Sequence, residues 1–333
     1  MNLLTISVYV VIVLAFIGIA IGRLPRLAMN RASIALAAAL ILVLLGGISH
    51  DEAFAAIDVE TLALLLAMMF IVANLRISGF FGLAGSRLLS MAGNPRSFLA
   101  LVIVSSGFLS ALFLNDTICL MLTPLVIEIV RRKKFDGRPY LIALAVSANA
   151  GSCATPIGNP QNMLIASQSG LRFFDFVLLL GPPSLFALGL CYAACLITFH
   201  QDFSTHRIAR PELDSRSAIN NPGPTPEAQD RKLMIKSLVA ATVLLVLLAT
   251  GLRTSVAALS ASTVLLVSRR IKPERVFAHV DFELLVFFSG LFVAGQAERE
   301  GMRIGFMDYL KLGLPVTLAS VAAGSLWLQA LGN

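Results

Sequence analysis

An aspartate inside an apolar run is the first chemically reactive feature of this chain. The segment SALFLNDTICLMLTPL (110–125) places Asn115, Asp116 and Thr117 between stretches of apolar residues. A carboxylate at bilayer depth costs about 2.5–3.5 kcal/mol on membrane-insertion scales, so such residues generally serve a function. We therefore expect Asp116 to have a functional role at a position that water or a solute can reach. The alternative is structural, with the Asp or Asn capping the helix that follows.

A second polar interruption lies in the next apolar span. Residues 147–162 read SANAGSCATPIGNPQN, and these small residues, prolines and asparagines cannot continue a regular helix. The pattern predicts an unwound stretch and then a new half-helix, with Asn159 as its N-cap and Pro160 at its first position. A proline-kinked helix without a ligand is the alternative.

Two half-helices would then begin inside the membrane, at 115–117 and at 159–160. The N–H groups and positive dipole ends of such helices hold anions, and the carbonyl oxygens of unwound backbone hold Na⁺, as in secondary transporters. We expect no bound cofactor and no metal centre, with Na⁺ or H⁺ available as a coupling ion. The candidate solute- and ion-binding residues are Asn115, Asp116, Thr117, Ser147, Asn149, Gly151, Thr155, Gly158, Asn159 and Asn162.

Long apolar segments provide the elements that position these residues. The 333-residue chain is 57% hydrophobic and 14% charged, whereas soluble domains are about 25% charged. This composition indicates an all-α, multi-pass protein of the inner or plasma membrane. The expected spans are 5–22, 33–48, 59–77, 140–168 (interrupted), 174–199, 233–251, 254–268, 281–296 and 309–331. The first of them is expected to be a retained helix rather than a cleaved signal.

The segment 97–130 is expected to form a re-entrant hairpin. Arginines precede it and the cluster Arg131–Lys134 follows it, so both flanks carry the positive charge typical of the cytoplasmic side. Its tip at Leu114–Thr117 would lie at membrane depth, where non-helical backbone needs protein or a water-filled cavity around it. The same rule places the loop 49–58 outside. It places the basic loops 23–31, 131–138, 207–236 and 269–275 in the cytoplasm.

The sequence contains an internal repeat. IDVETLALLLAMMFIVA (57–73) matches VDFELLVFFSGLFVAGQ (280–296) at a constant offset, 281 − 58 = 223 residues. A second match joins 170–189 to 301–320, and the polar linker 200–232 separates the two copies. The distribution of basic loops gives the copies opposite orientations, as in inverted-repeat transporters.

The second copy is shorter than the first. Residues 72 and 170 are 98 apart, whereas the matching residues 295 and 301 are 6 apart, so 98 − 6 = 92 residues are missing. These would carry a second hairpin and a second broken helix, and either a real deletion or a gene-model error would remove them. The expected domains are scaffold helices in 1–56, a first repeat in 57–199 with the hairpin (97–130) and the broken helix (140–168), a cytoplasmic linker in 200–232 and an incomplete second repeat in 233–333.

Other kinds of chemistry have little support in the sequence. The four cysteines lie in apolar spans without CxxC spacing, and the four histidines lie in loops, so no metal site is predicted. An enzyme is not expected, because HExxH, Ser–His–Asp and phosphate-binding glycine motifs are absent. The net charge of +7 comes from loop cations without interleaved aromatic residues, which argues against nucleic-acid binding.

The two interrupted segments resemble the paired signatures of the ion-transporter superfamily. This superfamily includes arsenical pump membrane proteins, NhaD-type sodium–proton antiporters, citrate-type transporters and divalent-anion sodium symporters. The segments are LSALFLNDTICLMLTPLVIEI and ANAGSCATPIGNPQNMLI, and DFELLVFFSGLFVAG (281–295) and YLKLGLPVTLASVAAG (309–324) are similar to later parts of the family pattern.

This resemblance implies an inverted-repeat fold, often dimeric, and ion-coupled movement of a small anion or oxyanion. In the symporter branch the hairpin tip reads Ser-Asn-Thr and binds Na⁺, whereas Leu114–Thr117 here reads Leu-Asn-Asp-Thr. The aspartate is closer to the arsenical-pump and antiporter branches, which favours a cation- or proton-titrating role for Asp116.

These features together predict a secondary active membrane transporter. Its solute would be a small anion or oxyanion, arsenite-like, carboxylate or inorganic, and its transport would be coupled to H⁺ or Na⁺ and impaired by the missing segment. The alternatives are a Na⁺/H⁺ antiporter and a non-transporting remnant of the same family. The expected partners are the solute, the lipid bilayer and a second copy of the chain.

Overall fold

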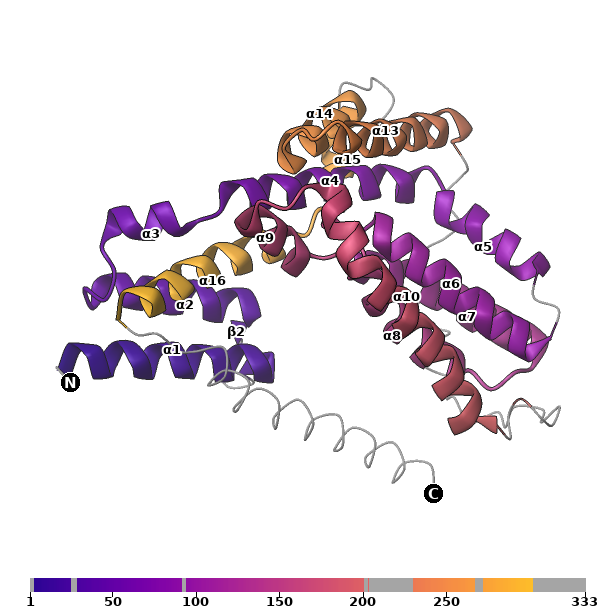
Figure 1. The fold of residues 1–333 in the computed structure, drawn as a ribbon, viewed down its shortest axis with the longest axis horizontal. Coiled ribbons are helices and arrows are strands. Elements are labelled where there is room, and N and C mark those ends of the chain that lie inside the picture. The colour runs from indigo at the N-terminus through magenta and orange to yellow at the C-terminus, as the bar shows by residue number, and fades with distance from the viewer. Residues whose placement is uncertain are drawn as a thin grey trace. The chain divides into compact units, whose positions relative to one another are not determined.

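The computed structural model describes residues 3–24, 29–91, 94–200, 203, 230–266 and 272–301 (Figure 1). The described chain is helical except for a short antiparallel ribbon that joins β1 (Arg23–Leu24) to β2 (Met29–Asn30). Two compact units form, one from residues 1–58 and 282–333 and the other from residues 59–281. This grouping places the repeat segment that begins at residue 282 with the N-terminal helices.

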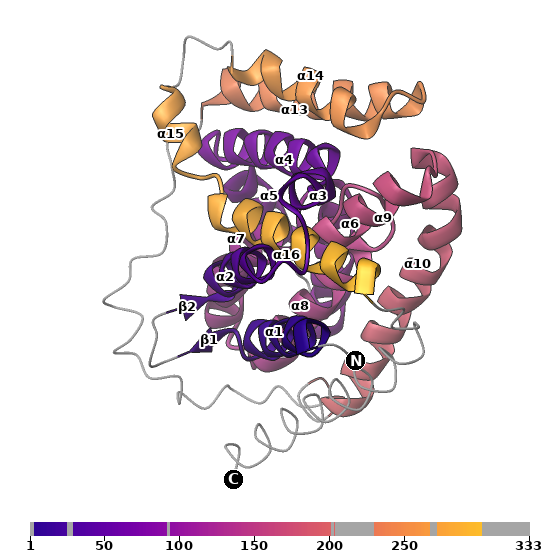
Figure 2. The same ribbon diagram turned by 90° about the vertical axis from the view of Figure 1, so that its left-hand side faces the viewer.

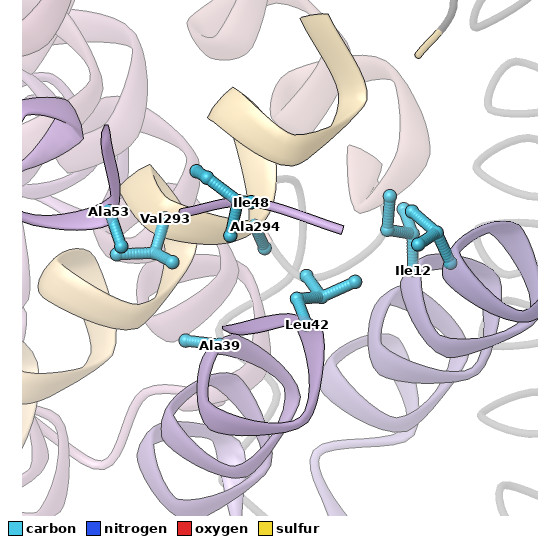
Figure 3. Close-up of a cluster of buried hydrophobic side chains, with 8 residues drawn as sticks. Ile12, Ala39, Leu42, Ile48, Ala53, Val293 and Ala294 are labelled. Carbon is cyan, nitrogen blue, oxygen red and sulfur yellow. The ribbon is translucent and has the colours of Figure 1, made fainter. Parts of the chain in front are cut away.

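The first unit consists of four described helices. These are α1 (Leu3–Ile21), α2 (Arg31–Leu44), α3 (His50–Ala56) and α16 (Phe282–Gly301). Helix α16 packs on α2, α3 and α1, and small or branched side chains fill the space between these helices (Figure 3). The cluster consists of Val8, Ile12, Ala39, Leu42, Ile48, Ala53, Val293 and Ala294. At Gly290 the backbone of α16 approaches α2 so closely that a β-carbon would lie 2.6 Å from the carbonyl carbon of Ala35.

The second unit holds the two interrupted segments. In chain order its helices are α4 (Val59–Ile77), α5 (Phe80–Met91), α6 (Pro95–Leu112), α7 (Asn115–Lys133), α8 (Arg138–Ser152), α9 (Pro160–Ser169), α10 (Phe173–Thr198), α13 (Arg231–Ala249), α14 (Thr254–Leu266) and α15 (Pro273–Phe277). Helices α13 and α14 lie side by side and both contact α4 (Figures 1 and 2). Helix α8 contacts α6, α7 and α10, and α9 contacts α4.

The helix lengths agree with a multi-pass membrane protein. Four described helices are long and apolar enough to cross a bilayer, namely Leu4–Ile21, Val59–Ile77, Pro95–Leu112 and Phe173–Thr198. Shorter apolar helices occupy Arg31–Leu44, Thr254–Leu265 and Phe282–Ala294. The all-α, polytopic fold class is therefore confirmed. The expected span 309–331 and most of the linker 200–232 fall outside the described residues.

Both predicted helix interruptions are present. The segment 97–130 is broken at Phe113 and Leu114, between α6 and α7, and the segment 140–168 is unwound from Cys153 to Asn159. The predicted start of the second half-helix is also confirmed. Asn159 is the N-cap of α9, its side chain accepts a hydrogen bond from the backbone N–H of Asn162, and Pro160 is the first helical residue.

The alternative in which Asn115 or Asp116 caps α7 is wrong. The N-cap residue of α7 is Leu114, which provides no side-chain capping bond, and Asp116 lies within the first turn. Capping requires the polar side chain at the residue before the first helical one. Here the helix begins earlier than the sequence suggested, so that the carboxylate becomes part of the helix rather than its cap.

The positions of the helices support the predicted repeat. Helices α2, α3 and α4 begin at residues 31, 50 and 59, and α14, α15 and α16 begin at residues 254, 273 and 282, each 223 later. The packing follows the same correspondence, because α4 contacts α14, the counterpart of α2, and α16, the counterpart of α4, contacts α2. The two pairs of matching helices therefore make reciprocal contacts. Such contacts are expected between elements related by a two-fold axis.

Candidate functional site

The tip of the first interruption is joined to the second by a backbone hydrogen bond. The N–H of Asn115 donates to the carbonyl oxygen of Gly158 across 3.1 Å. The side-chain amide of Asn115 also donates to Oδ1 of Asn149, on the last turns of α8, at 3.5 Å. The broken helix and the hairpin tip thus form one site rather than two separate kinks.

Two asparagines hold the unwound stretch in place. Nδ2 of Asn162 donates to the carbonyl oxygens of Ser152, Cys153 and Thr155 at 3.2, 3.1 and 2.9 Å. Nδ2 of Asn159 donates to Oγ of Ser152 at 3.0 Å. Backbone carbonyls that leave a helix inside protein need such donors, because an unpaired buried carbonyl is costly. Asn159 and Asn162 therefore stabilise the loop, and their amides are already used.

Glycines allow the backbones at this site to approach each other. A β-carbon on Gly151 would lie 2.2 Å from the carbonyl oxygen of Gly107, where α8 meets α6. A β-carbon on Gly158 would lie 2.3 Å from the carbonyl oxygen of Ser152 and 2.8 Å from that of Ser110. Real β-carbons do not approach backbone atoms this closely, so only glycine fits at either position.

Buried hydroxyl groups join α6 to α8 and to the unwound stretch. Oγ of Ser147 and Oγ of Ser106 form a buried hydrogen bond between the two helices. Oγ1 of Thr155 donates to the carbonyl oxygen of Ala111, next to the hairpin tip. These contacts fix the hairpin arm against the broken helix without placing a charge in the interior.

Exposure divides the ten predicted site residues into two groups. Asp116 and Asn149 are exposed, and Asn115 and Thr117 are half-buried. The remaining six are buried and serve the framework described above: Ser147, Gly151, Thr155, Gly158, Asn159 and Asn162. The accessible part of the candidate site therefore consists of two amides, a hydroxyl and a carboxyl group.

The two helix N-termini at the site differ in their capping. At α9 the side chain of Asn159 already accepts from the backbone, whereas the first turn of α7 has no side-chain cap. The partial positive charge at the start of a helix stabilises a nearby anion. At α7 the carboxyl group of Asp116 lies in the first turn, beside this helix N-terminus.

Ser110 is a site residue that the sequence did not reveal. Its side chain is fully buried, and its hydroxyl has no hydrogen-bond partner among the residues that the structure describes. It lies in the last turn of α6, and its carbonyl oxygen adjoins Gly158. Three serines occur in this part of α6, and nothing in their spacing singles one of them out. Burial without a partner distinguishes Ser110.

A bundle of membrane-length helices with two broken segments joined at their polar breaks defines a class of protein, the membrane transporters. The comparison with known sequences specifies the family. The chain belongs to the citrate transporter family (CitMHS), whose profile matches residues 9–332. This confirms the resemblance to the ion-transporter superfamily and assigns a multi-pass, non-enzymatic protein of the plasma membrane.

Relatives with known names agree with this assignment. The chain is 31% identical to the silicon efflux transporter LSI3 of Oryza sativa subsp. japonica, over 90% of this chain and 69% of the rice protein. It is 30% identical to an uncharacterized transporter of Mycobacterium tuberculosis, over 88% of this chain and 67% of that protein. It is also 30% identical to a 46 kDa membrane protein of Mycobacterium leprae, over 79% of this chain and 62% of that protein. The chain thus spans about two thirds of the length of these relatives.

Proposed function

We propose that the chain is a secondary active transporter for a small anion or oxyanion, coupled to H⁺ or Na⁺. The observation that carries the proposal is the hydrogen bond from the N–H of Asn115 to the carbonyl oxygen of Gly158. It brings an exposed carboxylate, two amides and a helix N-terminus to the edge of an unwound membrane segment, which is the usual construction of a transporter site.

The charge of Asp116 provides a physical reason for coupling. An anionic solute at the start of α7 would be repelled by an ionised Asp116 in the first turn of the same helix. Two like charges about 4 Å apart repel by about 4 kcal/mol at an effective dielectric constant of 20. A proton or Na⁺ on Asp116 removes this repulsion, so cation and solute bind together.

Ser110 adds an oxygen ligand to the coupling site. Its buried hydroxyl without a partner and the carbonyl oxygens around Gly158 are the kind of oxygen donors that hard cations prefer. In this proposal Na⁺ or H⁺ binds at Asp116, while the solute contacts Asn115, Thr117 and Asn149.

Na⁺/H⁺ antiport is the second candidate, and the exposed position of Asp116 favours it. In that case the carboxylate exchanges Na⁺ for H⁺ and no anion moves. A proteoliposome assay separates the two candidates. Symport of an anion requires uptake of labelled solute that rises with an imposed Na⁺ or H⁺ gradient, whereas antiport gives Na⁺ movement and proton counterflow without any solute.

The proposed transporter has an incomplete second half. The alignment with the rice protein is 347 positions long, more than the 333 residues of this chain, so it contains positions at which this chain has no residue. This supports the predicted internal deletion. Loss of the second hairpin and second broken helix would leave half of a two-fold site, and we expect slow transport or, as a further alternative, a non-transporting remnant. We also propose a homodimer.

The test is flux in proteoliposomes with a panel of labelled solutes: arsenite, silicate, phosphate, sulfate and citrate. The expected result is uptake of one solute that depends on a cation gradient and is abolished by Asp116→Asn. Solute movement that ignores both Na⁺ and H⁺ gradients would refute coupling. Fast, gradient-dependent transport by this chain would instead show that the missing segment is not needed.

A further inference from the structure

The open end of the α6–α7 hairpin carries a dense positive charge. Arg131, Arg132, Lys133 and Lys134 are consecutive and all exposed. They form the end of α7, where Lys134 adopts a left-handed conformation with φ of 57° and stops the helix. Basic residues at a helix C-terminus interact favourably with the negative end of the helix dipole. One basic residue is enough for this interaction.

The acidic residues near this cluster are already engaged. Arg132 pairs with Glu128 one turn earlier at 2.5 Å, and Asp136 pairs with Arg138 at 2.7 Å. Within the described residues, no ion pair involves Arg131, Lys133 or Lys134. The turn therefore presents cations to its surroundings rather than forming a closed salt-bridge network.

An aromatic cluster holds the two ends of the hairpin together at this point. Phe98 of α6, Phe135 of the turn and Tyr140 of α8 contact one another, with ring centroids 4.8 to 6.3 Å apart. The hydroxyl of Tyr140 donates to the carbonyl oxygen of Pro95 at 3.2 Å. The exposed Arg96 adjoins Pro95 and so lies at the same end of the hairpin as the basic turn.

We propose that this end of the hairpin binds the headgroup of an anionic phospholipid. Clusters of four or more Lys and Arg residues at the end of an apolar helix are the composition that recognises anionic lipid. The cationic residues assigned to the site are Arg96, Arg131, Lys133 and Lys134.

Exposed apolar side chains further along α6 favour a lipid over a free phosphate. Val104 and Phe108 are 62% and 63% exposed, so acyl chains have apolar surface to cover on the same helix that carries Arg96 in its first turn. A lipid whose phosphate contacts residues from both arms would hold the hairpin closed at its base. This site is separate from the hairpin tip and goes beyond the proposed transport.

The test measures lipid binding by the purified full chain in detergent micelles. Fluorescently labelled phosphatidylglycerol and phosphatidylcholine are titrated with protein, and their anisotropy is followed. We expect tighter binding of phosphatidylglycerol, and a weakening of about 5-fold for each cationic side chain removed in the double variant Arg131→Gln/Lys133→Gln. The charge-preserving variant Arg131→Lys/Lys133→Arg should keep the preference.

A matched control removes the same charge elsewhere. Arg231 and Lys232 are exposed at the start of α13, and Arg231→Gln/Lys232→Gln should leave binding unchanged. Thermal unfolding of each variant verifies the fold. If both double glutamine variants weakened phosphatidylglycerol binding equally, the effect would come from net charge alone, and the proposed site would be overturned. Displacement of labelled phosphatidylglycerol by millimolar inorganic phosphate would also overturn it, because the site would then recognise a soluble anion.

Discussion

Gly151 of α8 lies directly against Gly107 of α6. The carbonyl oxygen of Gly107 is only 2.2 Å from the point at which residue 151 would place a β-carbon. The unwound stretch begins just after this crossing, at Cys153. The position of the broken helix relative to the hairpin arm therefore depends on the absence of a side chain at Gly151.

We expect Gly151→Ala to destabilise the protein. The neighbour is backbone rather than a flexible side chain, so α6 and α8 would have to separate, and overpacking of this kind typically costs about 1–3 kcal/mol. Thermal unfolding in detergent measures the loss. Gly189→Ala in α10 is the matched control, because nothing lies within 4 Å of its β-carbon position and alanine favours a helix over glycine. Equal stability of the two variants would contradict the close crossing.

Asn162→Leu should also destabilise the protein, for a different reason. It removes the donor that serves the carbonyl oxygens of Ser152, Cys153 and Thr155, and each buried group left unpaired costs about 1–3 kcal/mol. Hydrogen exchange of residues 153–159 provides the measurement. Faster exchange confined to this stretch is expected, whereas unchanged exchange would show that the loop does not depend on Asn162. Gln161→Leu is the control, because its side chain is exposed.

Local chemistry explains which parts of the site were predictable from sequence. The N-cap Asn159 followed by Pro160 is a signal contained in adjacent residues, and it was predicted correctly. The break in 97–130 was also predictable, because a polar cluster interrupts an apolar run. The N-cap position of Leu114 was not predictable, because an apolar residue carries no capping side chain that the sequence could reveal.

Contacts between distant segments explain what the sequence could not provide. The bond from Asn115 to Gly158 and the crossing of Gly107 with Gly151 depend on how α6 and α8 pack. The division of the ten candidates into accessible and buried residues depends on the same packing. The role of Ser110 follows only from its burial, which no spacing rule indicates.

Asp116→Asn should change coupling and leave the fold intact. The side chain is exposed, so little packing is lost, but a neutral amide lacks the negative charge that attracts Na⁺ and does not take up a proton near neutral pH. Hydrogen bonds to charged groups contribute about 1.5–3 kcal/mol, so affinity for the coupling cation should fall about 10- to 100-fold. Flux in proteoliposomes at varied pH and Na⁺ concentration measures this. Asp51→Asn, also exposed in the first turn of a helix, should behave as wild type; an unchanged cation dependence in Asp116→Asn would exclude Asp116 from coupling.

The turn between α7 and α8 should lose stability in acid. Burial alone would raise the pKa of Asp136, but hydrogen bonds and the positive charge of Arg138 outweigh it and hold the pKa below its usual range. A carboxyl whose pKa is lower in the folded state contributes stability above its unfolded pKa, and this contribution disappears as the pH falls through the folded pKa. We expect Asp136→Asn to lower stability at neutral pH and to have little effect once the wild-type carboxyl is protonated. Unfolding midpoints of the two proteins, measured from neutral pH down to about pH 3, should therefore converge in acid; a constant difference across this range would show that the charge of Asp136 makes no contribution.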